Sequence, residues 1–171
     1  FSREVKEANW RYYVPRTVHL SSLSFGIHSI IASELGRSDE AYEFFKHAAH
    51  VDLGPSPHAS DAGIHAGAMG ALWQAVVNGF GGLRLRPDGL LAFRPRLPEP
   101  WRRLAFLVEW RGVRLRAEIR RSQLALERLG EPERSVPVEV EGEMYTLEDK
   151  LQVTFSKAGP GKPAPETGQE H

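Results

Sequence analysis

The segment from residue 61 to residue 71, DAGIHAGAMGA, has the composition of an anion-binding loop that turns into a helix. The first backbone N–H groups of a helix have no partner within it, and the helix dipole makes that end positive. Gly63 lets a ligand approach the backbone closely, and His65 lies in the predicted first turn. We therefore predict a pocket for an anion or a sugar oxygen. The alternative is that the small residues only let two helices pack tightly beside a core histidine.

A second polar cluster lies just before and inside another predicted helix start, and consists of Thr17, His19, Ser21, Ser22 and Ser24. Hydroxyl groups and free N–H groups at such a place suit phosphate or sugar. Helix capping by the serines is the simpler explanation, and residue propensity alone favours it. Both interpretations stay open at the level of the residues.

Other reactive residue types give no recognisable catalytic or metal site. The chain has no Gly-x-Ser-x-Gly segment, which frames many serine nucleophiles. His47 and His50 are three residues apart on a helix, but no carboxylate completes a zinc pattern, so we interpret them as surface residues. Asp52 and Asp61 are the carboxylates nearest the loop. No spacing identifies them as a pair for glycoside chemistry, and we interpret both as structural.

Composition excludes several classes of function. The 171 residues carry 22 basic and 22 acidic side chains, and this balance argues against nucleic acid as the main partner. Cysteine is absent, which excludes disulfides and thiol catalysis. No apolar run reaches the roughly 18 residues of a membrane span, so we expect no membrane partner. Because the chain begins with Phe1, we expect a fragment of a longer protein.

Residues 21 to 80 have the periodicity of helices. The first helix is expected to begin at the serines 21 and 22 and to end at Gly36. A second begins at Ser38, residues 54–60 form a loop, and a third helix runs from about residue 61 to residue 78. The first helix carries an apolar stripe at helical spacing: Leu23, Ile27, Ile30, Ile31 and Leu35.

After Gly82 the apolar residues recur at every second position, as in strands. Residues 104–110 and 113–119 alternate around the tight connection Arg111–Gly112, which predicts a hairpin with one apolar and one charged face. Trp110 is expected to face the core. About seven short strands in an antiparallel sandwich are predicted, the others being near 83–85, 91–93, 124–126, 136–140 and 151–155.

These patterns divide the chain into a helical part, 1–82, a sheet part, 83–155, and a tail or linker, 156–171. The sheet part can bury its own apolar face. Three helices rich in glycine and alanine bury little apolar area by themselves. The helical part is therefore expected to belong to a larger helical domain.

Five separated motifs resemble, in order, those of family 65 glycoside hydrolases and phosphorylases. They are YYVPRTVHLSSLS (12–24), HSI (28–30), GIHAGAM (63–69), WQAVVNGFGGL (73–83) and FRPRLP (93–98). Members of that family combine an N-terminal β-sandwich, an (α/α)6 barrel and a small C-terminal β-sandwich. The resemblance implies an α+β fragment, formed by the closing helices of the barrel followed by the small antiparallel C-terminal β-sandwich.

The resemblance also implies a function for the parent protein. Phosphorylases of the family cleave an α-glucoside such as maltose, trehalose or kojibiose with inorganic phosphate and inversion, releasing β-glucose 1-phosphate. Their glutamate general acid lies upstream of the matching segments, so we assign no catalytic residue and no metal to this chain. The resemblance places the phosphate and substrate pocket at the segments of His19, Ser21, Ser22, Gly63 and His65.

Two alternatives remain beside the phosphorylase interpretation. A hydrolase of the same family would use a water activated by a base, and a non-catalytic carbohydrate-binding or structural module would need no acid at all. Leu20, Ala62 and the loop 54–60 depart from the family pattern beside the pocket, which bears on substrate and phosphate dependence. We expect no cofactor other than phosphate as co-substrate, a cytoplasmic location, and a homodimer of the full-length enzyme.

Overall fold

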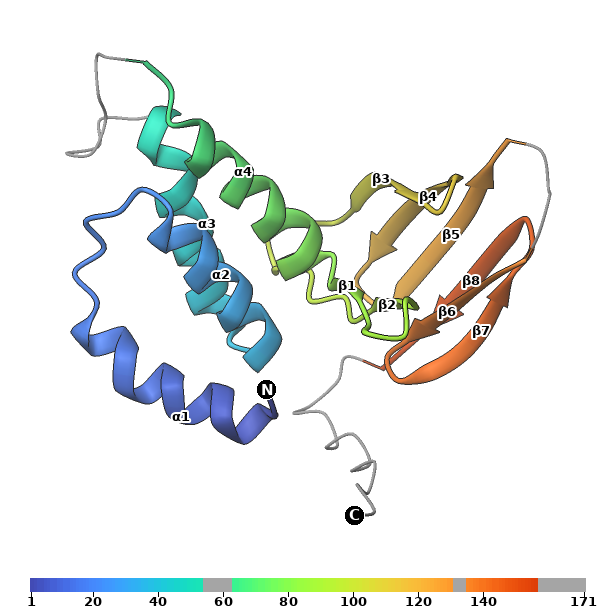
Figure 1. Ribbon diagram of the computed structural model, residues 1–171, viewed down its shortest axis with the longest axis horizontal. Helices are drawn as coiled ribbons and strands as arrows, with labels where there is room; N and C mark the ends of the chain where they lie inside the picture. The colour runs from blue at the N-terminus through green and yellow to red at the C-terminus, as the bar shows by residue number, and fades with distance from the viewer. Residues whose placement is uncertain (54–62, 131–134, 157–171) are drawn as a thin grey trace.

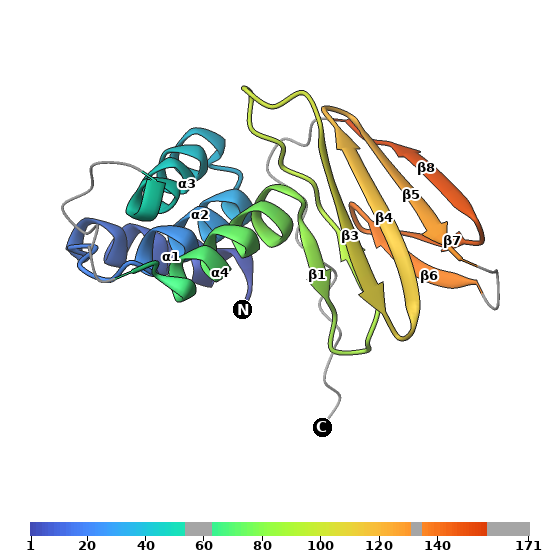
Figure 2. The same ribbon diagram turned by 90° about the horizontal axis from the view of Figure 1, so that it is seen from above.

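The computed structural model describes residues 1–53, 63–130 and 135–156. Its N-terminal part is helical, and two β-sheets follow along the chain (Figure 1). In the perpendicular view the helices and the sheets lie side by side, with α4 and β1 at the boundary between them (Figure 2). The mixed class of helix and sheet that the sequence predicts is confirmed.

Local sequence signals set the helix boundaries. Ser2 begins the first helix by accepting a hydrogen bond from the N–H of Val5, and Gly36 ends α2 in a left-handed conformation with φ 76°. None of the helices in the described ranges is long and apolar enough to cross a membrane. The helices are α1 (Arg3–Tyr13), the 3-10 turn η1 (Val14–Arg16), α2 (Ser24–Leu35), α3 (Ser38–Leu53), α4 (Ala66–Gln74) and the π-helical η2 (Ala75–Phe80).

Three features of the helices differ from the sequence prediction. The pattern does not predict α1, and the helix expected to begin at the serines 21 and 22 begins at Ser24, with Leu23 at its N-cap position and no side-chain cap. The third predicted helix begins at Ala66 and ends in the π-helical turn. Asp61, Ala62 and the predicted loop 54–60 lie outside the described residues.

Near its start, α2 buries small residues and not the apolar stripe, of which only Leu35 at the other end is fully buried. Gly26, Ser29 and Ala32 are buried, whereas Leu23 and Ile27 are 45% and 44% exposed. Glycine, serine and alanine allow a neighbouring helix to approach the backbone more closely than leucine or isoleucine would. At this end of α2, the helices therefore pack closely through small residues, and the larger side chains stay exposed.

Helices α2 and α4 make this close contact and run in the same direction. A methyl group on Gly67 would lie 3.0 Å from Leu23 Cδ2, and one on Gly26 would lie 2.7 Å from the Cβ of Ala71. Further along, Gly79 in η2 faces Ser33 near the end of α2. Because the pairing advances along both helices together, their N-termini lie at the same end (Figure 1).

Eight strands in the described ranges form two four-stranded sheets, ordered β1-β2-β6-β7 and β3-β4-β5-β8. Arg111 and Gly112 have φ values of 49° and 78°, as a two-residue hairpin turn requires, and the predicted hairpin is confirmed. The pairing is antiparallel except between β2 and β6, which are parallel. The strands are β1 (Leu83–Leu85), β2 (Leu91–Phe93), β3 (Leu104–Trp110), β4 (Val113–Arg120), β5 (Gln123–Leu129), β6 (Val136–Val140), β7 (Glu143–Leu147), which the pattern does not predict, and β8 (Lys150–Thr154).

Both sheets contribute side chains to one hydrophobic core. Phe93 and Val138 enter it from one sheet, and Leu115 and Leu126 enter it from the other. Alternate residues of each strand face this core, as the period of two predicts. Trp110 packs against the core as predicted, but it is only partly buried.

Phe80 connects the helical part to the sheet part. It is 1% exposed, and its ring centroid lies 5.4 Å from that of Phe45 on α3 and 5.1 Å from that of Trp101 before β3. Arg84 of β1 adds a polar contact, because its Nε donates to Glu34 of α2 at 2.8 Å. Aromatic packing and an ion pair thus hold β1 against the helices.

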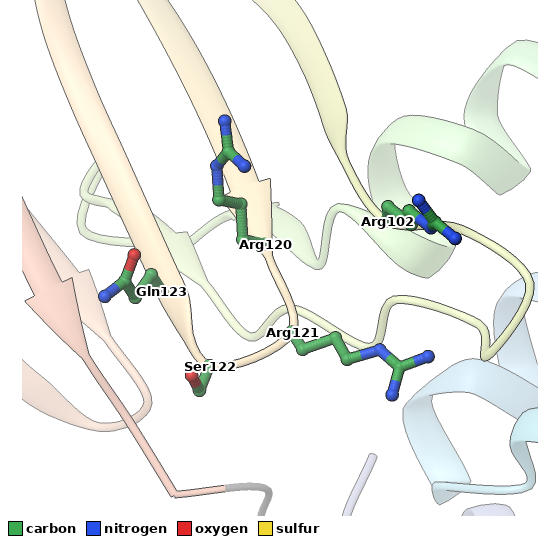
Figure 3. Close-up of a pocket in the computed structure, with 5 residues that line it drawn as sticks. All are labelled: Arg102, Arg120, Arg121, Ser122 and Gln123. Atoms are coloured by element: carbon green, nitrogen blue, oxygen red, sulfur yellow. The ribbon is translucent and has the colours of Figure 1, made fainter.

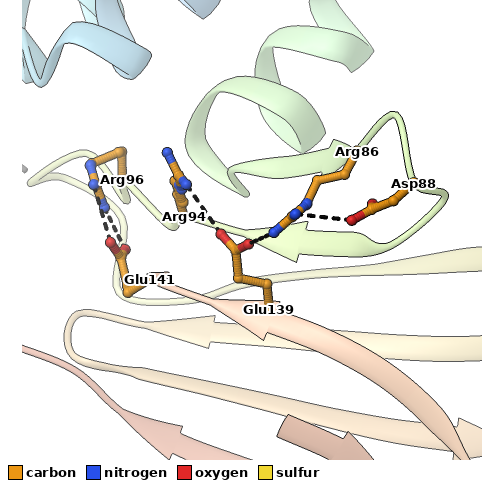
Figure 4. A network of polar contacts seen from close by, with 6 residues as sticks. All are labelled: Arg86, Asp88, Arg94, Arg96, Glu139 and Glu141. Atoms are coloured by element: carbon orange, nitrogen blue, oxygen red, sulfur yellow. Dashed lines mark hydrogen bonds and ion pairs between the residues drawn. The ribbon is translucent and has the colours of Figure 1, made fainter. Parts of the chain in front are cut away.

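A buried carboxylate on β6 connects this strand to the residues on either side of β2. Glu139 on β6 is 4% exposed and forms ion pairs with Arg86 and, at 3.1 Å, with Arg94 (Figure 4). Beside it, Arg96 pairs with Glu141 at 2.6 Å. A buried charge is tolerated only when it is paired in this way, so we assign this network a structural role.

Candidate anion-binding site at two helix starts

The N-termini of α2 and α4 form the most promising binding geometry in the chain. Leu23, at the N-cap position of α2, lies against Gly67 in the first turn of α4. Because the helices are parallel, the positive ends of their dipoles lie together. The first N–H group of each helix is paired locally, that of Ser24 with the carbonyl of Ser21 and that of Ala66 with the carbonyl of Ile64. The dipoles and the following N–H groups of two adjacent helix starts favour an anion more than those of one start do.

His65 occupies the N-cap position of α4 and is held there by Asp52 of α3. Its backbone N–H donates to Asp52 Oδ2 at 3.0 Å, and its Nδ1 lies 2.7 Å from Asp52 Oδ1. The carboxylate can only accept, so Nδ1 carries the proton. The Nε2 atom of the neutral ring can then accept an O–H of hydrogen phosphate or of a sugar, and it becomes a donor when the ring is protonated.

The sequence places Asp52 near the loop but does not reveal its contact with His65. Its side chain is 7% exposed, and the hydrogen bond from the His65 side chain is the main cause that lowers the pKa of its carboxyl group below the usual range. Asp52 and His65 are 13 positions apart across a loop, and no motif links them. The sequence interpretation of Asp52 as structural agrees with its hydrogen bond to the backbone N–H of His65. The sequence does not predict that Asp52 also fixes the proton of the His65 ring.

Gly63 and the two serines provide the open surroundings of these helix starts. Gly63 has φ 128°, which only glycine adopts without strain, and a methyl group there would meet no atom within 4 Å. Ser21 accepts a hydrogen bond from the N–H of Leu23 at 3.3 Å, which is a local turn contact just before α2 and not a helix cap. Its hydroxyl hydrogen is still available to donate. Ser22 is half-buried.

His19 lies in an unusual conformation just before α2. Its φ is 50°, in the left-handed region that residues other than glycine seldom adopt. Its Nδ1 lies 2.8 Å from the hydroxyl oxygen of Ser24, and its ring stacks on that of Phe25 with centroids 4.8 Å apart. Burial, and then the charges of His28 and His47, lower the pKa of the His19 side chain.

The structure thus forms two clusters from the residues that the sequence singles out. One is His65 with Asp52, and the other is His19 with Ser24 and the rings around it. Within residues 1–53 and 63–130, no hydrogen bond joins His65 to Ser21 or Ser22. Thr17 donates to the carbonyl of Tyr13 and stays within its own turn. In the described part of the chain, no group of three or more histidine or carboxylate side chains is arranged to hold a metal ion.

A basic groove of about 480 Å³ lies elsewhere, at the turn between β4 and β5 (Figure 3). Two of its arginine side chains already have partners, because Arg120 pairs with Glu118 at 3.1 Å and Arg121 donates to the carbonyl of Glu99 at 3.3 Å. The groove is also wide open to solvent, where charge pairs are weak. We therefore favour the helix starts as the binding site. The groove is lined by Arg102, Arg120, Arg121, Ser122 and Gln123.

Known proteins match this chain over nearly its whole described length. Residues 1–74 match the central catalytic domain of glycosyl hydrolase family 65, and residues 83–147 match the C-terminal domain of the same family. A kojibiose phosphorylase of Halothermothrix orenii is 42% identical over 156 residues, which are 90% of this chain and 20% of that protein. An α,α-trehalose phosphorylase of Thermoanaerobacter brockii is 41% identical over 133 residues, which are 77% of this chain and 17% of that protein.

A solved structure agrees with these matches. The chain named "Putative kojibiose phosphorylase from human microbiome" superposes with a TM-score of 0.85 at 33% identity, over 93% of this chain and 23% of that one. The present chain therefore spans about a fifth of the length of the relatives that it matches.

Proposed function

Because the chain belongs to glycosyl hydrolase family 65, we propose that it is part of an inverting disaccharide phosphorylase and supplies part of the phosphate and sugar pocket. The matched relatives carry the names of kojibiose, trehalose and maltose phosphorylases, which supports phosphorolysis over hydrolysis. The single observation that carries the proposal is the parallel contact of α2 and α4, which brings two helix N-termini together.

In the proposed reaction, an oxygen of inorganic phosphate attacks the anomeric carbon of an α-glucoside. The new carbon–oxygen bond forms on the face opposite the leaving sugar, and the glycosidic carbon–oxygen bond breaks. The leaving oxygen takes a proton from a carboxylic acid, and inversion gives β-glucose 1-phosphate. We assign that acid to a part of the enzyme outside this chain.

The residues of this chain would bind and orient the attacking phosphate. Helix N–H groups and dipoles favour its negative charge, and the hydroxyl groups of Ser21 and Ser22 would donate to its oxygens. His65, with Nδ1 committed to Asp52, would bind through Nε2. Gly63 would leave room for the ligand, and His19 would complete the pocket from the other helix start.

The surface of the helical part supports its place in a larger catalytic domain. Val18, Leu20 and Ile64 are each more than three-quarters exposed, and Trp73 is 59% exposed. Large apolar side chains grouped near two helix starts and along α4 are typical of a surface that packs against further protein. We propose that this surface packs against the other helices of an (α/α)6 barrel, with the sheet part as the C-terminal domain.

The test uses the complete enzyme with kojibiose, trehalose and maltose, each with and without inorganic phosphate. We expect glucose 1-phosphate to form from one of these sugars only when phosphate is present, and proton NMR of the first product should show the β anomer. Release of free glucose without phosphate would instead assign the protein to the hydrolases of the family.

A further inference from the structure

We infer that His28 is a positioning residue for the anion pocket, because through the hydroxyl group of Ser24 it holds His19 in the tautomer that carries its proton on Nε2. The inference rests on the proposed function, in which His19 is a member of the phosphate pocket. It adds to that pocket a chain of hydrogen bonds from His28 to Ser24 to His19, which the motifs that contain these residues do not by themselves indicate.

The hydrogen bond from His28 to Ser24 fixes which ring nitrogen of His28 carries the proton. Its Nδ1 lies 2.8 Å from the backbone carbonyl oxygen of Ser24, one helical turn earlier. A carbonyl oxygen only accepts, so Nδ1 of His28 must be the donor. The same N–H lies 3.4 Å from the hydroxyl oxygen of Ser24. This approach favours the orientation in which the lone pairs of that hydroxyl face His28 and its hydrogen faces away.

The hydrogen bond between Ser24 and His19 then sets the tautomer of His19. The Ser24 hydroxyl oxygen lies 2.8 Å from His19 Nδ1, and in the inferred orientation the hydroxyl donates its hydrogen to that nitrogen. A neutral His19 that accepts at Nδ1 carries its proton on Nε2. Linked hydrogen bonds also polarise one another. The result is an N–H donor on Nε2 of His19, which is the kind of group that an anion requires.

Aromatic packing holds the three side chains in this geometry. His19 stacks on Phe25 with an angle of 9° between the rings, and the His28 ring meets it edge-on with centroids 4.7 Å apart. Phe44 of α3 lies against both histidines, with centroid distances of 5.4 Å and 5.2 Å. The strained backbone of His19 persists because these contacts determine its position.

Because neighbouring charges disfavour a second proton on His19, its tautomer decides whether Nε2 can donate a hydrogen bond. His28 on α2 and His47 on α3 are the titratable groups that lower its pKa, after burial. A second proton on the His19 ring is thereby disfavoured. The donor on Nε2 must then come from the choice of tautomer, and that choice is set by Ser24 and His28.

Three variants separate the N–H group of His28 from its ring. His28→Phe keeps an aromatic ring against Phe44 but removes the donor, His28→Asn keeps a side-chain N–H but removes the ring, and Ser24→Ala breaks the middle link. In the complete enzyme, we expect His28→Phe and Ser24→Ala to raise KM for phosphate roughly fivefold, the effect of one ordinary hydrogen bond. kcat should change less than KM, and His28→Asn should stay close to wild type.

His50→Gln is the matched control. It removes an exposed histidine of α3 without touching the hydrogen-bond chain or the rings that His19 contacts, so KM for phosphate should not change. The inference fails if His28→Phe leaves KM for phosphate unchanged, or if His28→Asn is as impaired as His28→Phe, since ring packing would then explain the effect.

A spectroscopic measurement keeps this inference separate from the proposed function. Nitrogen-15 NMR of labelled histidine side chains reports which ring nitrogen carries the proton, whether or not the enzyme uses phosphate. We expect the proton on Nδ1 in His28 and on Nε2 in His19, and a mixture of His19 tautomers in Ser24→Ala. A His19 proton on Nδ1 in the wild-type protein would overturn the inference even if phosphorolysis were demonstrated.

Discussion

Gly26 is the position at which the contact between α2 and α4 can be tested most directly. A methyl group there would lie 2.7 Å from the Cβ of Ala71 and 3.1 Å from its backbone carbon and oxygen. Backbone atoms cannot rotate away as a long side chain can, so Gly26→Ala must push the two helices apart. Overpacking of this kind costs about 1–3 kcal/mol.

Gly70 offers a matched control on α4. A methyl group there would meet no atom within 4 Å. Replacing glycine by alanine inside a helix stabilises it by about 0.5–1 kcal/mol, and this gain is common to both positions. We therefore expect Gly70→Ala to raise the free energy of unfolding by that amount. Gly26→Ala should be less stable than Gly70→Ala by the overpacking cost of about 1–3 kcal/mol.

Urea unfolding followed by circular dichroism measures this difference. The midpoints of the wild-type chain and the two variants give the free energies, and equal slopes show that the surface exposed on unfolding has not changed. Equal stability of Gly26→Ala and Gly70→Ala would refute the close approach of the helices. The shared position of their N-termini would then lose its support.

Four further outcomes follow from the described contacts. Asp52→Ala should destabilise the start of α4 by about 1 kcal/mol, the net value of an ordinary hydrogen bond, because it removes the acceptor of the His65 backbone N–H. The urea midpoint should fall, and an unchanged midpoint would contradict this contact. Glu118 has a pKa lowered from 4.5 to about 2, chiefly by Arg103, so its contribution to stability is complete above pH 4.5 and is lost as the pH falls toward 2. The difference in urea midpoint between wild type and Glu118→Gln should therefore be smaller at pH 3 than at pH 6, and an equal difference would argue against the ion pair. Trp110→Ala should lower the free energy of unfolding by about 2–3 kcal/mol, because the ring is only partly buried and removal of a fully buried ring costs about 3–5 kcal/mol. A loss below about 1 kcal/mol would mean that Trp110 lies at the surface. In hydrogen exchange, α2 and α4 should be less protected than β3 and β4, since small residues bury little area; equal protection would contradict the view that the helices need further packing partners.

The elements that the sequence predicts well are those with a strong period or a strong stop signal. Residues 104–120 alternate over two full strands around Arg111 and Gly112, and the hairpin follows directly from that pattern. Gly36 ends α2 as expected. By contrast, α1 is polar on average and buries only Trp10, so its amphipathic pattern depends on few apolar residues and is easily missed. The parallel pairing of β2 with β6 joins segments more than 40 residues apart, and no local pattern can encode it.

The candidate site was predictable as two helix starts but not as a set of contacts. Small residues around Gly63 and Gly67 indicate a close approach of backbone, and the structure shows such an approach between α2 and α4. Two further contacts come from elsewhere: Asp52 from the end of α3 binds His65, and His28 from the next turn of α2 binds Ser24, the partner of His19. These partners depend on how the helices pack, which residue types alone do not specify.

The central claim is that the two helix starts bind phosphate together, and phosphorolysis kinetics of the complete enzyme test it most directly. KM for phosphate and KM for the disaccharide should be measured for wild type, for His65→Ala and for the double variant Ser21→Ala/Ser22→Ala. We expect each variant to raise KM for phosphate at least tenfold, about 1.4 kcal/mol, with a smaller change in KM for the disaccharide. Unchanged KM for phosphate in both variants would contradict the claim.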